Sequence, residues 1–335
     1  MRSHSHHHRP HALKPLLTVA AGITVLTLGL PPASAVPAAS AVSAAAAVPA
    51  TTAVLAAPAV AASAPLGGTP YLGWSSWSMQ SSKYPGLNPK GPFSYLTEAN
   101  VLKQAGAMAS KLKKYGYEYV NIDAGWWMNW NWQTGYDQYG RQAADPQRFP
   151  HGMKHLADEI HTLGLKAGIY LPVGLEKSAY GGGTVPIWNA DGCTTADIVY
   201  PDLRTTNGWD SAYKIDFSRP CAQKYVDSQA QMFAGWGYDL LKLDGVGPGS
   251  GKSGDNYNTV DDVVAWKKAI ATAGRPVHLE LAWSLDVNHI GDWQANANGW
   301  RVDTDVECYC RTLVTWDNSV NDRWTDVPNW TPHAG

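Results

Sequence analysis

The sequence predicts an α/β protein built as a (β/α)8 TIM barrel, apparently truncated after the sixth strand. From about Pro65, strand-like and helix-like segments alternate, which is typical of a parallel sheet covered by helices. In a barrel the ligand-binding groups collect on the rim formed by the strand ends, whereas a doubly wound open sheet gathers them at one switch point. The barrel is favoured because polar or aromatic residues end several strands: Asp123, Tyr170, Asp244, Trp283 and Asp305.

The elements follow in order along the chain. Strands are expected at residues 71–74, 119–123, 166–171, 239–244, 277–282 and 300–303. Helical patterns lie between them at 98–114, 152–163, 221–236 and 260–272. An eight-stranded barrel would lack two βα units and leave unpaired edges, so we expect either a fragment of a barrel or another architecture.

The composition excludes some classes of protein and favours one class of ligand. The 335 residues are 16% charged with a formal net charge of −2, which excludes a strongly basic nucleic-acid binder. Sixteen Trp stand against four Phe, and an indole offers a broad apolar face for stacking on a sugar ring. We therefore expect an oligo- or polysaccharide partner. For the four indoles within 126–132, a loop platform for sugar rings is favoured over core packing.

The first 64 residues are expected to lie outside the fold. Basic residues precede an apolar run at 16–30, and Ala33-Ser34-Ala35 forms a small-residue cleavage pattern, so 1–35 is predicted to be a signal peptide. The alternative is an uncleaved anchor, although the run is shorter than the ~20 residues that span a bilayer. Residues 36–64 form an Ala/Val/Pro-rich linker, and 65–335 form the barrel. A secreted protein, with no membrane attachment after cleavage, is expected.

Four cysteines are disulfide candidates in an exported chain. Cys193 and Cys221 would close a long loop, whereas Cys308 and Cys310 are separated by one residue and would pair only with strain. Zinc-binding spacing is absent from the sequence, so no zinc site is expected.

The first candidate catalytic group follows the fourth strand. Lys242 and Asp244 are two residues apart and therefore share one face of a strand. The ammonium is expected to lower the pKa of Asp244, and an ionised Asp at a barrel mouth can act as a nucleophile. A buried structural ion pair is the alternative.

The second acid comes from residues 301–305. In an extended chain Arg301, Asp303 and Asp305 point the same way, and close like charges raise the pKa of one carboxyl, as a general acid requires. Glycoside hydrolysis uses such a pair of carboxyl groups. Acids at strand ends also bind Mg²⁺, which leaves a metal enzyme as a competitor.

Six motifs, in order along the chain, resemble the signatures of glycoside hydrolase family 27, the α-galactosidase group of the melibiase clan. They are Gly73-Trp74-Ser75-Ser76-Trp77, residues 119–123 (YVNID), residues 149–153 (FPHGM), residues 161–170 (HTLGLKAGIY), Lys242-Leu243-Asp244, and Trp300-Arg301 with Asp305.

The resemblance implies a (β/α)8 barrel and a retaining, two-step mechanism without a cofactor. Asp244 resembles the nucleophile and Asp305 the general acid/base, with Asp303 as the fallback. The sugar-lining positions are matched by Trp77, Asp123, Tyr170, Lys242, Trp283 and Arg301. Retention would place the two catalytic carboxyl groups roughly 5 to 5.5 Å apart. The resemblance also implies that the last two βα units and a C-terminal β-sandwich are lacking.

Departures from the family pattern bear on which sugar is released. Where the family usually has Asp-Asp, Gly-Cys and Cys-Glu-Trp, this chain has Asp123-Ala124, Gly245-Val246 and Leu281-Ala282-Trp283. Losing hydrogen-bond partners for sugar hydroxyls lowers discrimination between sugars. An isomaltodextranase-like or β-L-arabinopyranosidase-like hydrolase therefore fits as well as an α-galactosidase, and a non-catalytic carbohydrate-binding protein is the opposing class.

Overall fold

The computed structural model describes residues 66–334. The predicted signal peptide and linker lie outside these residues. None of the helices within 66–334 is both long and apolar enough to cross a membrane.

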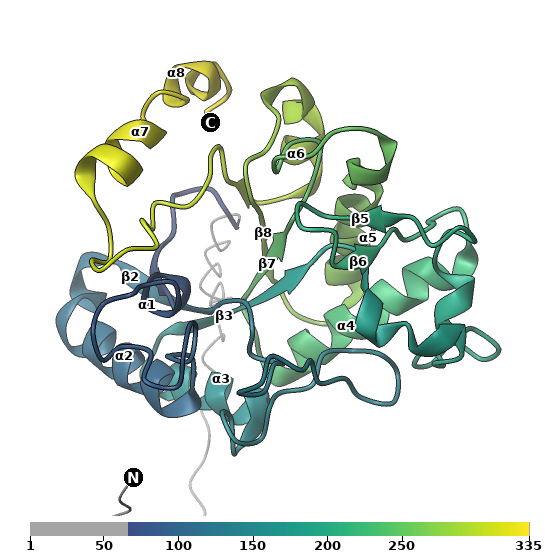
Figure 1. Cartoon of the computed structure of the whole chain (residues 1–335), viewed down its shortest axis with the longest axis horizontal. Helices are drawn as coiled ribbons and strands as arrows, with labels where there is room; N and C mark the ends of the chain where they lie inside the picture. Colours follow the sequence, from purple (N-terminus) through teal and green to yellow (C-terminus); the bar gives the residue numbers. More distant parts are fainter. Residues whose placement is uncertain (1–65, 335) are drawn as a thin grey trace, which may run out of the picture. The chain divides into compact units, whose positions relative to one another are not determined.

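Six parallel strands form the curled central sheet (Figure 1). They are β1 (Leu72–Ser75), β2 (Tyr117–Ile122), β3 (Lys166–Pro172), β7 (Leu240–Asp244), β8 (His278–Leu281) and β9 (Gly299–Trp300), adjacent in that order. Every strand expected from the sequence is present. The last one differs, because it ends at Trp300 and not at residue 303. The parallel order with helical crossovers is that of a (β/α)8 barrel.

The four expected helices cover this sheet. They are α2 (Glu98–Lys111), α3 (Gly152–Thr162), α4 (Pro220–Trp236) and α5 (Val260–Thr272), and α6 (Ile290–Asn296) precedes β9. The Thr97 side chain accepts a hydrogen bond from the Asn100 N–H and caps α2. The expected helix at 98–114 is interrupted after Lys111. It continues as a short 3-10 turn that ends at Gly116, whose φ of 89° suits glycine.

The remaining elements are short. They are the helices α1 (Trp77–Gln80), α7 (Asn321–Arg323) and α8 (Val327–Trp330), a π-helix (Trp316–Val320), seven 3-10 turns (Lys113–Tyr115, Lys177–Ala179, Gly181–Gly183, Thr195–Asp197, Asp255–Tyr257, Val287–His289, Thr331–His333) and the strands β4 (Leu175–Glu176), β5 (Thr205–Thr206) and β6 (Ala212–Tyr213). The last three form a separate antiparallel sheet in the order β4-β6-β5.

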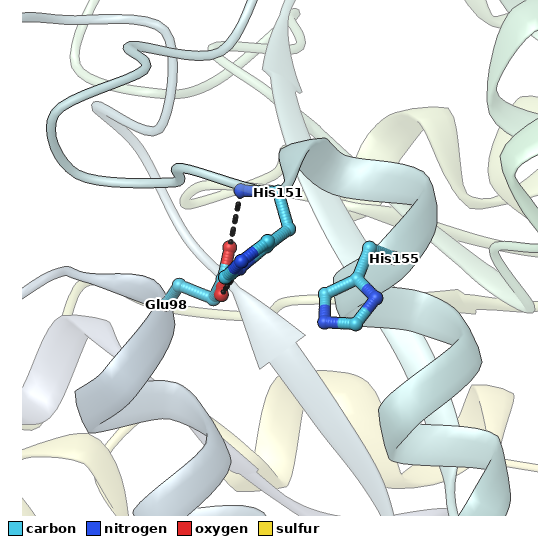
Figure 2. Close-up of side chains that lie close together, drawn as sticks. All are labelled: Glu98, His151 and His155. Atoms are coloured by element: carbon cyan, nitrogen blue, oxygen red, sulfur yellow. Dashed lines mark hydrogen bonds and ion pairs between the residues drawn. The ribbon is translucent and has the colours of Figure 1, made fainter. Parts of the chain in front are cut away.

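Helices α2 and α3 are joined at their first turns (Figure 2). The Glu98 carboxylate accepts a hydrogen bond from the His151 backbone N–H at 3.1 Å, and its other oxygen lies 2.6 Å from His151 Nδ1. Glu98 is buried, so this contact fixes the chain entering α3 against the start of α2.

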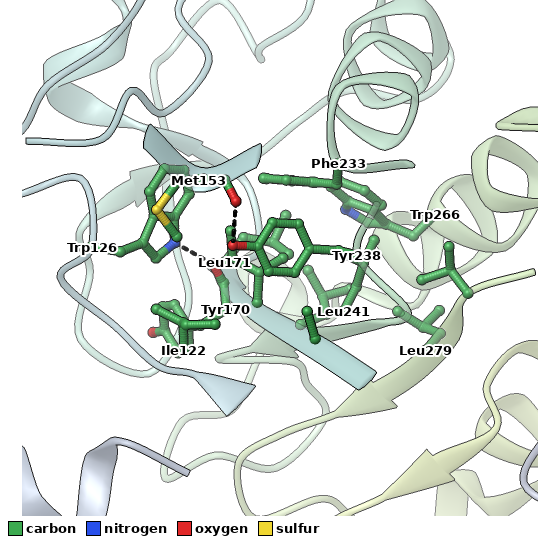
Figure 3. Close-up of a cluster of buried hydrophobic side chains, with 14 of the residues drawn as sticks. Ile122, Trp126, Met153, Tyr170, Leu171, Phe233, Tyr238, Leu241, Trp266 and Leu279 are labelled. Carbon is green, nitrogen blue, oxygen red and sulfur yellow. Dashed lines mark hydrogen bonds between the residues drawn. The ribbon is translucent and has the colours of Figure 1, made fainter. Parts of the chain in front are cut away.

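The main core lies between the sheet and its helices (Figure 3). Ile122, Leu171, Leu241 and Leu279 come from four neighbouring strands and are almost fully buried. Burying an aliphatic side chain of this size stabilises the fold by roughly 1.5 to 3 kcal/mol. Continuous apolar runs of this kind are typical of parallel strands covered on both faces.

The four cysteines form two disulfides, including the Cys308–Cys310 pair that was expected to form only with strain. Cys193 and Cys221 join the start of α4 to the segment around the small sheet, with 5.8 Å between their Cα atoms. Cys308 and Cys310 are also bonded, with Cα atoms 5.1 Å apart. Tyr309 between them has a left-handed φ of 50°, which is unfavourable for a bulky residue. The strain expected for this turn is therefore present in the backbone conformation of Tyr309.

The sheet does not close within residues 66–334, because β1 and β9 are its two ends and do not pair with each other. A cavity of about 720 Å³ is lined by β1 and by the segment that follows β9.

Candidate active site

A cavity of about 400 Å³ lies at the carboxyl ends of the strands. It is lined by all but one of the predicted site residues: Trp77, Asp123, Tyr170, Lys242, Asp244, Trp283 and Asp305. The exception, Arg301, contacts Asp305 from outside the cavity. Segments more than 220 residues apart in sequence are thus brought to one place by the parallel order of the strands.

Asp244 is the last residue of β7, and one of its carboxylate oxygens accepts a hydrogen bond from the Gly245 N–H at 2.8 Å. Burial raises the pKa of Asp244 above its usual range and outweighs the lowering by the Lys242 ammonium. The expectation that Lys242 would leave this carboxyl with a lowered pKa is therefore wrong. The depth at which the strand end is buried cannot be read from the spacing of residues.

The sequence predicts an ion pair between Lys242 and Asp244. In the structure Lys242 pairs with Asp123 instead. Its Oδ2 lies 2.9 Å from Lys242 Nζ and also accepts hydrogen bonds from Ser75 Oγ and Asn121 Nδ2, both at 3.1 Å. Only 2% of Asp123 is exposed, so its charge is compensated almost entirely by these donors.

Asp305 lines the same cavity and lies within a cluster of three donors. Arg301 Nη1 donates to Oδ1 at 2.7 Å, Trp77 Nε1 donates to Oδ2 at 3.3 Å, and the Tyr309 hydroxyl also donates to Oδ2. Burial alone would raise the pKa of Asp305. The Arg301 guanidinium and the hydrogen bonds from Tyr309 and Arg301 outweigh burial, so the pKa lies below the usual range. The sequence predicts a raised pKa for the general acid, and this prediction is wrong for Asp305.

Asp303, the fallback acid, does not line the cavity at the strand ends. One of its carboxylate oxygens lies 3.3 Å from Arg323 Nη1, and the residue lines the larger cavity beside β1. The expected extended arrangement of residues 301–305 is therefore wrong, because the strand ends at Trp300 and bends follow.

Trp77, Asp123, Lys242 and Asp305 line both cavities. They form a wall between the cavity at the strand ends and the larger one beside β1.

Aromatic rings form much of the lining. Trp77 stacks on Phe93 with ring centres 5.2 Å apart, and Trp127 stacks on Tyr170 at 5.9 Å. Trp132 is 51% exposed and lines the cavity, which agrees with a platform at this loop. Trp126 is fully buried and donates to the Tyr170 carbonyl at 2.9 Å, so the platform interpretation is wrong for this indole.

Three titratable residues of the lining were not predicted from the sequence. Tyr309 belongs to the Cys308–Cys310 turn and reaches Asp305. Arg148 is buried and donates to main-chain carbonyls that include Gly125 and Met128, at 2.9 and 2.8 Å. Glu176 ends the two-residue strand β4 and is 7% exposed. None follows a strand that the sequence pattern reveals, which is the signal that identified Asp123, Tyr170 and Asp244.

A second group of titratable side chains lies on the α2–α3 contact. Glu98, His151 and His155 offer metal-ligating atoms within 4.8 Å of one another. Both Glu98 oxygens already face His151 donors, so we assign the group a structural role (Figure 2).

Comparison with known proteins gives concordant matches. The family model described as α-galactosidase A matches residues 69–216. The chain is 30% identical to α-galactosidase 3 of Hypocrea jecorina over 73% of its length, and 28% identical to human α-galactosidase A over 79%. It spans only 38% and 49%, respectively, of these two relatives.

A solved structure is similar over a larger share. The GH27 β-L-arabinopyranosidase of Geobacillus stearothermophilus superposes with a TM-score of 0.66 at 28% identity. The match covers 80% of this chain and 59% of that one.

Proposed function

Because the chain belongs to glycoside hydrolase family 27, the family of the α-galactosidases, we propose that it is a secreted retaining glycosidase acting on terminal sugars. The observation that carries the proposal is that Asp244 and Asp305 line one cavity at the strand ends, among aromatic rings suited to stacking on a pyranose. Secretion is supported by the predicted leader and by two disulfides.

The proposed reaction has two steps. In the first, an Asp244 oxygen attacks the anomeric carbon while the glycosidic C–O bond breaks, and Asp305 gives its proton to the leaving oxygen. In the second, Asp305 takes a proton from water, which attacks the anomeric carbon and releases Asp244. Arg301 and Tyr309 stabilise the Asp305 carboxylate that exists between the steps.

The pKa directions of the two carboxyl groups favour the opposite roles, with Asp305 as nucleophile and Asp244 as acid/base. The pKa of Asp244 is raised and that of Asp305 is lowered. The motif assignment is retained because Asp244 ends a barrel strand beside Lys242.

Two features concern the released sugar. Ala124 and Ala282 stand where the family usually carries carboxylates, and the solved relative above is named a β-L-arabinopyranosidase. L-Arabinopyranose is the galactose ring without its hydroxymethyl group and needs fewer polar partners. We propose α-D-galactosides and β-L-arabinopyranosides as the first substrates, with α-glucosides of the isomaltodextran type as a further choice.

The test is hydrolysis of the three corresponding aryl glycosides by the wild type and by Asp244→Ala. We expect the wild type to hydrolyse at least one of these substrates with retention of configuration at the anomeric carbon. Asp244→Ala should lose this activity. Equal background rates in both proteins would indicate a carbohydrate-binding protein without turnover. Loss of wild-type activity on EDTA treatment would instead indicate a metal-dependent enzyme.

A further inference from the structure

Glu176 is a buried carboxyl in the wall of the cavity that the proposed mechanism does not use. It ends β4, which pairs with β6 through the register Glu176 with Ala212. The small sheet thereby brings it beside Trp127 and Tyr170 in the cavity lining. With 7% of its surface exposed, Glu176 is part of the site and not of the outer rim.

The surroundings of Glu176 do not compensate a charge. Within residues 66–334, no Lys, Arg or His nitrogen lies within ion-pair distance of it. Its Oε2 accepts a hydrogen bond from the neutral Gln142 amide at 3.0 Å. Burial raises the pKa of Glu176 to about 7, although the neutral donors Gln142, Tyr136 and Trp127 lower it in part.

The polar groups around Glu176 are also incompletely satisfied. The Oε1 atom of Gln142 is buried and makes no hydrogen bond to any described residue. The buried indole N–H of Trp127 lies close enough to Glu176 to lower its pKa, but it makes no hydrogen bond of standard geometry. An uncompensated carboxyl among unpaired polar groups costs stability, and such groups concentrate where a ligand supplies the missing partners.

The other carboxyl groups of the cavity are already committed. Asp123 is paired with Lys242, and Asp305 is paired with Arg301. Asp244 is assigned to the reacting carbon. Glu176 is therefore the carboxyl that remains available for a sugar hydroxyl, in a cavity where Ala124 presents only a methyl group.

We propose that Glu176, oriented by Gln142, is a specificity-determining subsite that binds one hydroxyl group of the sugar. The inference rests on the proposed function, since it concerns the sugar in the same cavity. A hydroxyl both donates and accepts, so it can satisfy the carboxyl in either protonation state.

The test is a binding cycle that uses defined sugars. Methyl α-D-galactopyranoside, its 2-, 3-, 4- and 6-deoxy analogues and methyl β-L-arabinopyranoside are titrated calorimetrically into the wild type, Glu176→Ala and the isosteric Glu176→Gln. The exposed Glu118→Gln serves as a control for the loss of one charge.

One deoxy analogue should bind the wild type about 10- to 100-fold more weakly than the parent sugar, as expected for a lost hydrogen bond to a charged group. In Glu176→Ala that penalty should vanish for this analogue alone, and in Glu176→Gln it should shrink. If Glu176→Ala does not fold, Glu176→Gln decides the outcome. Unchanged penalties in a folded variant would overturn the inference while the wild type still hydrolyses its substrate. A wild type that neither binds nor hydrolyses these sugars would overturn the proposed function as well.

Discussion

The ammonium group of Lys242 lies 2.9 Å from the carboxylate of Asp123, 119 residues earlier in the chain. This contact links β7 to the end of β2 directly below the cavity. Both side chains are largely buried, at 13% and 2% exposure, so each depends on the other for compensation of its charge.

Replacing Lys242 by Met should therefore lower the free energy of unfolding by roughly 3 to 5 kcal/mol, because Asp123 would be left buried without a cation. The matched control is Lys166→Met on β3, whose partner Glu118 is about half exposed. That pair should contribute less than about 1 kcal/mol. Urea denaturation measures both variants, and equal losses would contradict the compensation argument.

The catalytic roles predict different responses to the leaving group. Asp244→Ala should lose roughly 10⁴-fold or more in kcat with every aryl glycoside, because no other group attacks the anomeric carbon. Asp305→Ala should lose about 10²- to 10⁴-fold with a poor leaving group and much less with 2,4-dinitrophenolate, which leaves without a proton. Azide should restore turnover in Asp305→Ala with a glycosyl azide of retained configuration, because it attacks the glycosyl-enzyme in place of water. Any azide product of Asp244→Ala should have the inverted configuration, and the opposite pattern would reverse the two assignments.

The hydrogen bond from Tyr309 predicts a change in pH dependence. Tyr309→Phe removes a donor that stabilises the Asp305 carboxylate, so the pKa of Asp305 should rise. A general acid is active when protonated, and its activity is lost as the pH rises through its pKa. The alkaline limb of the kcat/KM profile should therefore move to higher pH. The exposed Tyr84→Phe is the control, and an unshifted limb in Tyr309→Phe would remove Asp305 from this role.

The two disulfides should differ in their effect on stability. Replacing Cys193 and Cys221 together by Ser opens a loop with a sequence separation of 28 and should cost about 3 to 4 kcal/mol in the chain-entropy model. The Cys308–Cys310 pair, with a separation of 2, should cost below about 2 kcal/mol by the same reasoning. Thermal unfolding of the two double variants tests the order, and a larger loss from the short loop would contradict it.

Buried Asp262 predicts a component of stability that weakens with rising pH. Burial raises the pKa of Asp262 from 3.8 to about 7, although it accepts a hydrogen bond from the Gly174 N–H at 3.1 Å. Between these two values the folded chain holds a proton that the unfolded chain releases, so the free energy of unfolding falls as the pH rises through this window. Asp262→Asn should therefore gain stability relative to the wild type between pH 5 and pH 8. A constant difference would show that the carboxyl does not titrate there.

Much of the fold could be predicted because its elements are long and periodic. The patterns at 166–171 and 260–272 match β3 and α5 almost to the residue, since burial on both sheet faces and on one helix face leaves a clear apolar spacing. The strand β4 has only two residues and no such pattern. Glu176, which it positions, was missed for that reason.

The composition of the site was better predicted than its contacts. Strand ends identified Asp123, Tyr170 and Asp244, because parallel strands finish on one rim. The partner of Lys242 could not be identified, because the contact crosses 119 residues of sequence. The pKa directions of Asp244 and Asp305 depend on burial and on Tyr309, neither of which a spacing argument contains.

The wall that Asp123, Lys242 and Asp305 form between two cavities affects how the site responds to occupancy. A sugar filling the cavity at the strand ends would displace solvent from the Asp305 carboxyl, which lines that cavity. Loss of solvent disfavours the charged form, so the pKa of Asp305 should be higher in the occupied than in the free protein. Because a general acid acts in its protonated form, the alkaline limb of the kcat profile should lie at higher pH than that of kcat/KM.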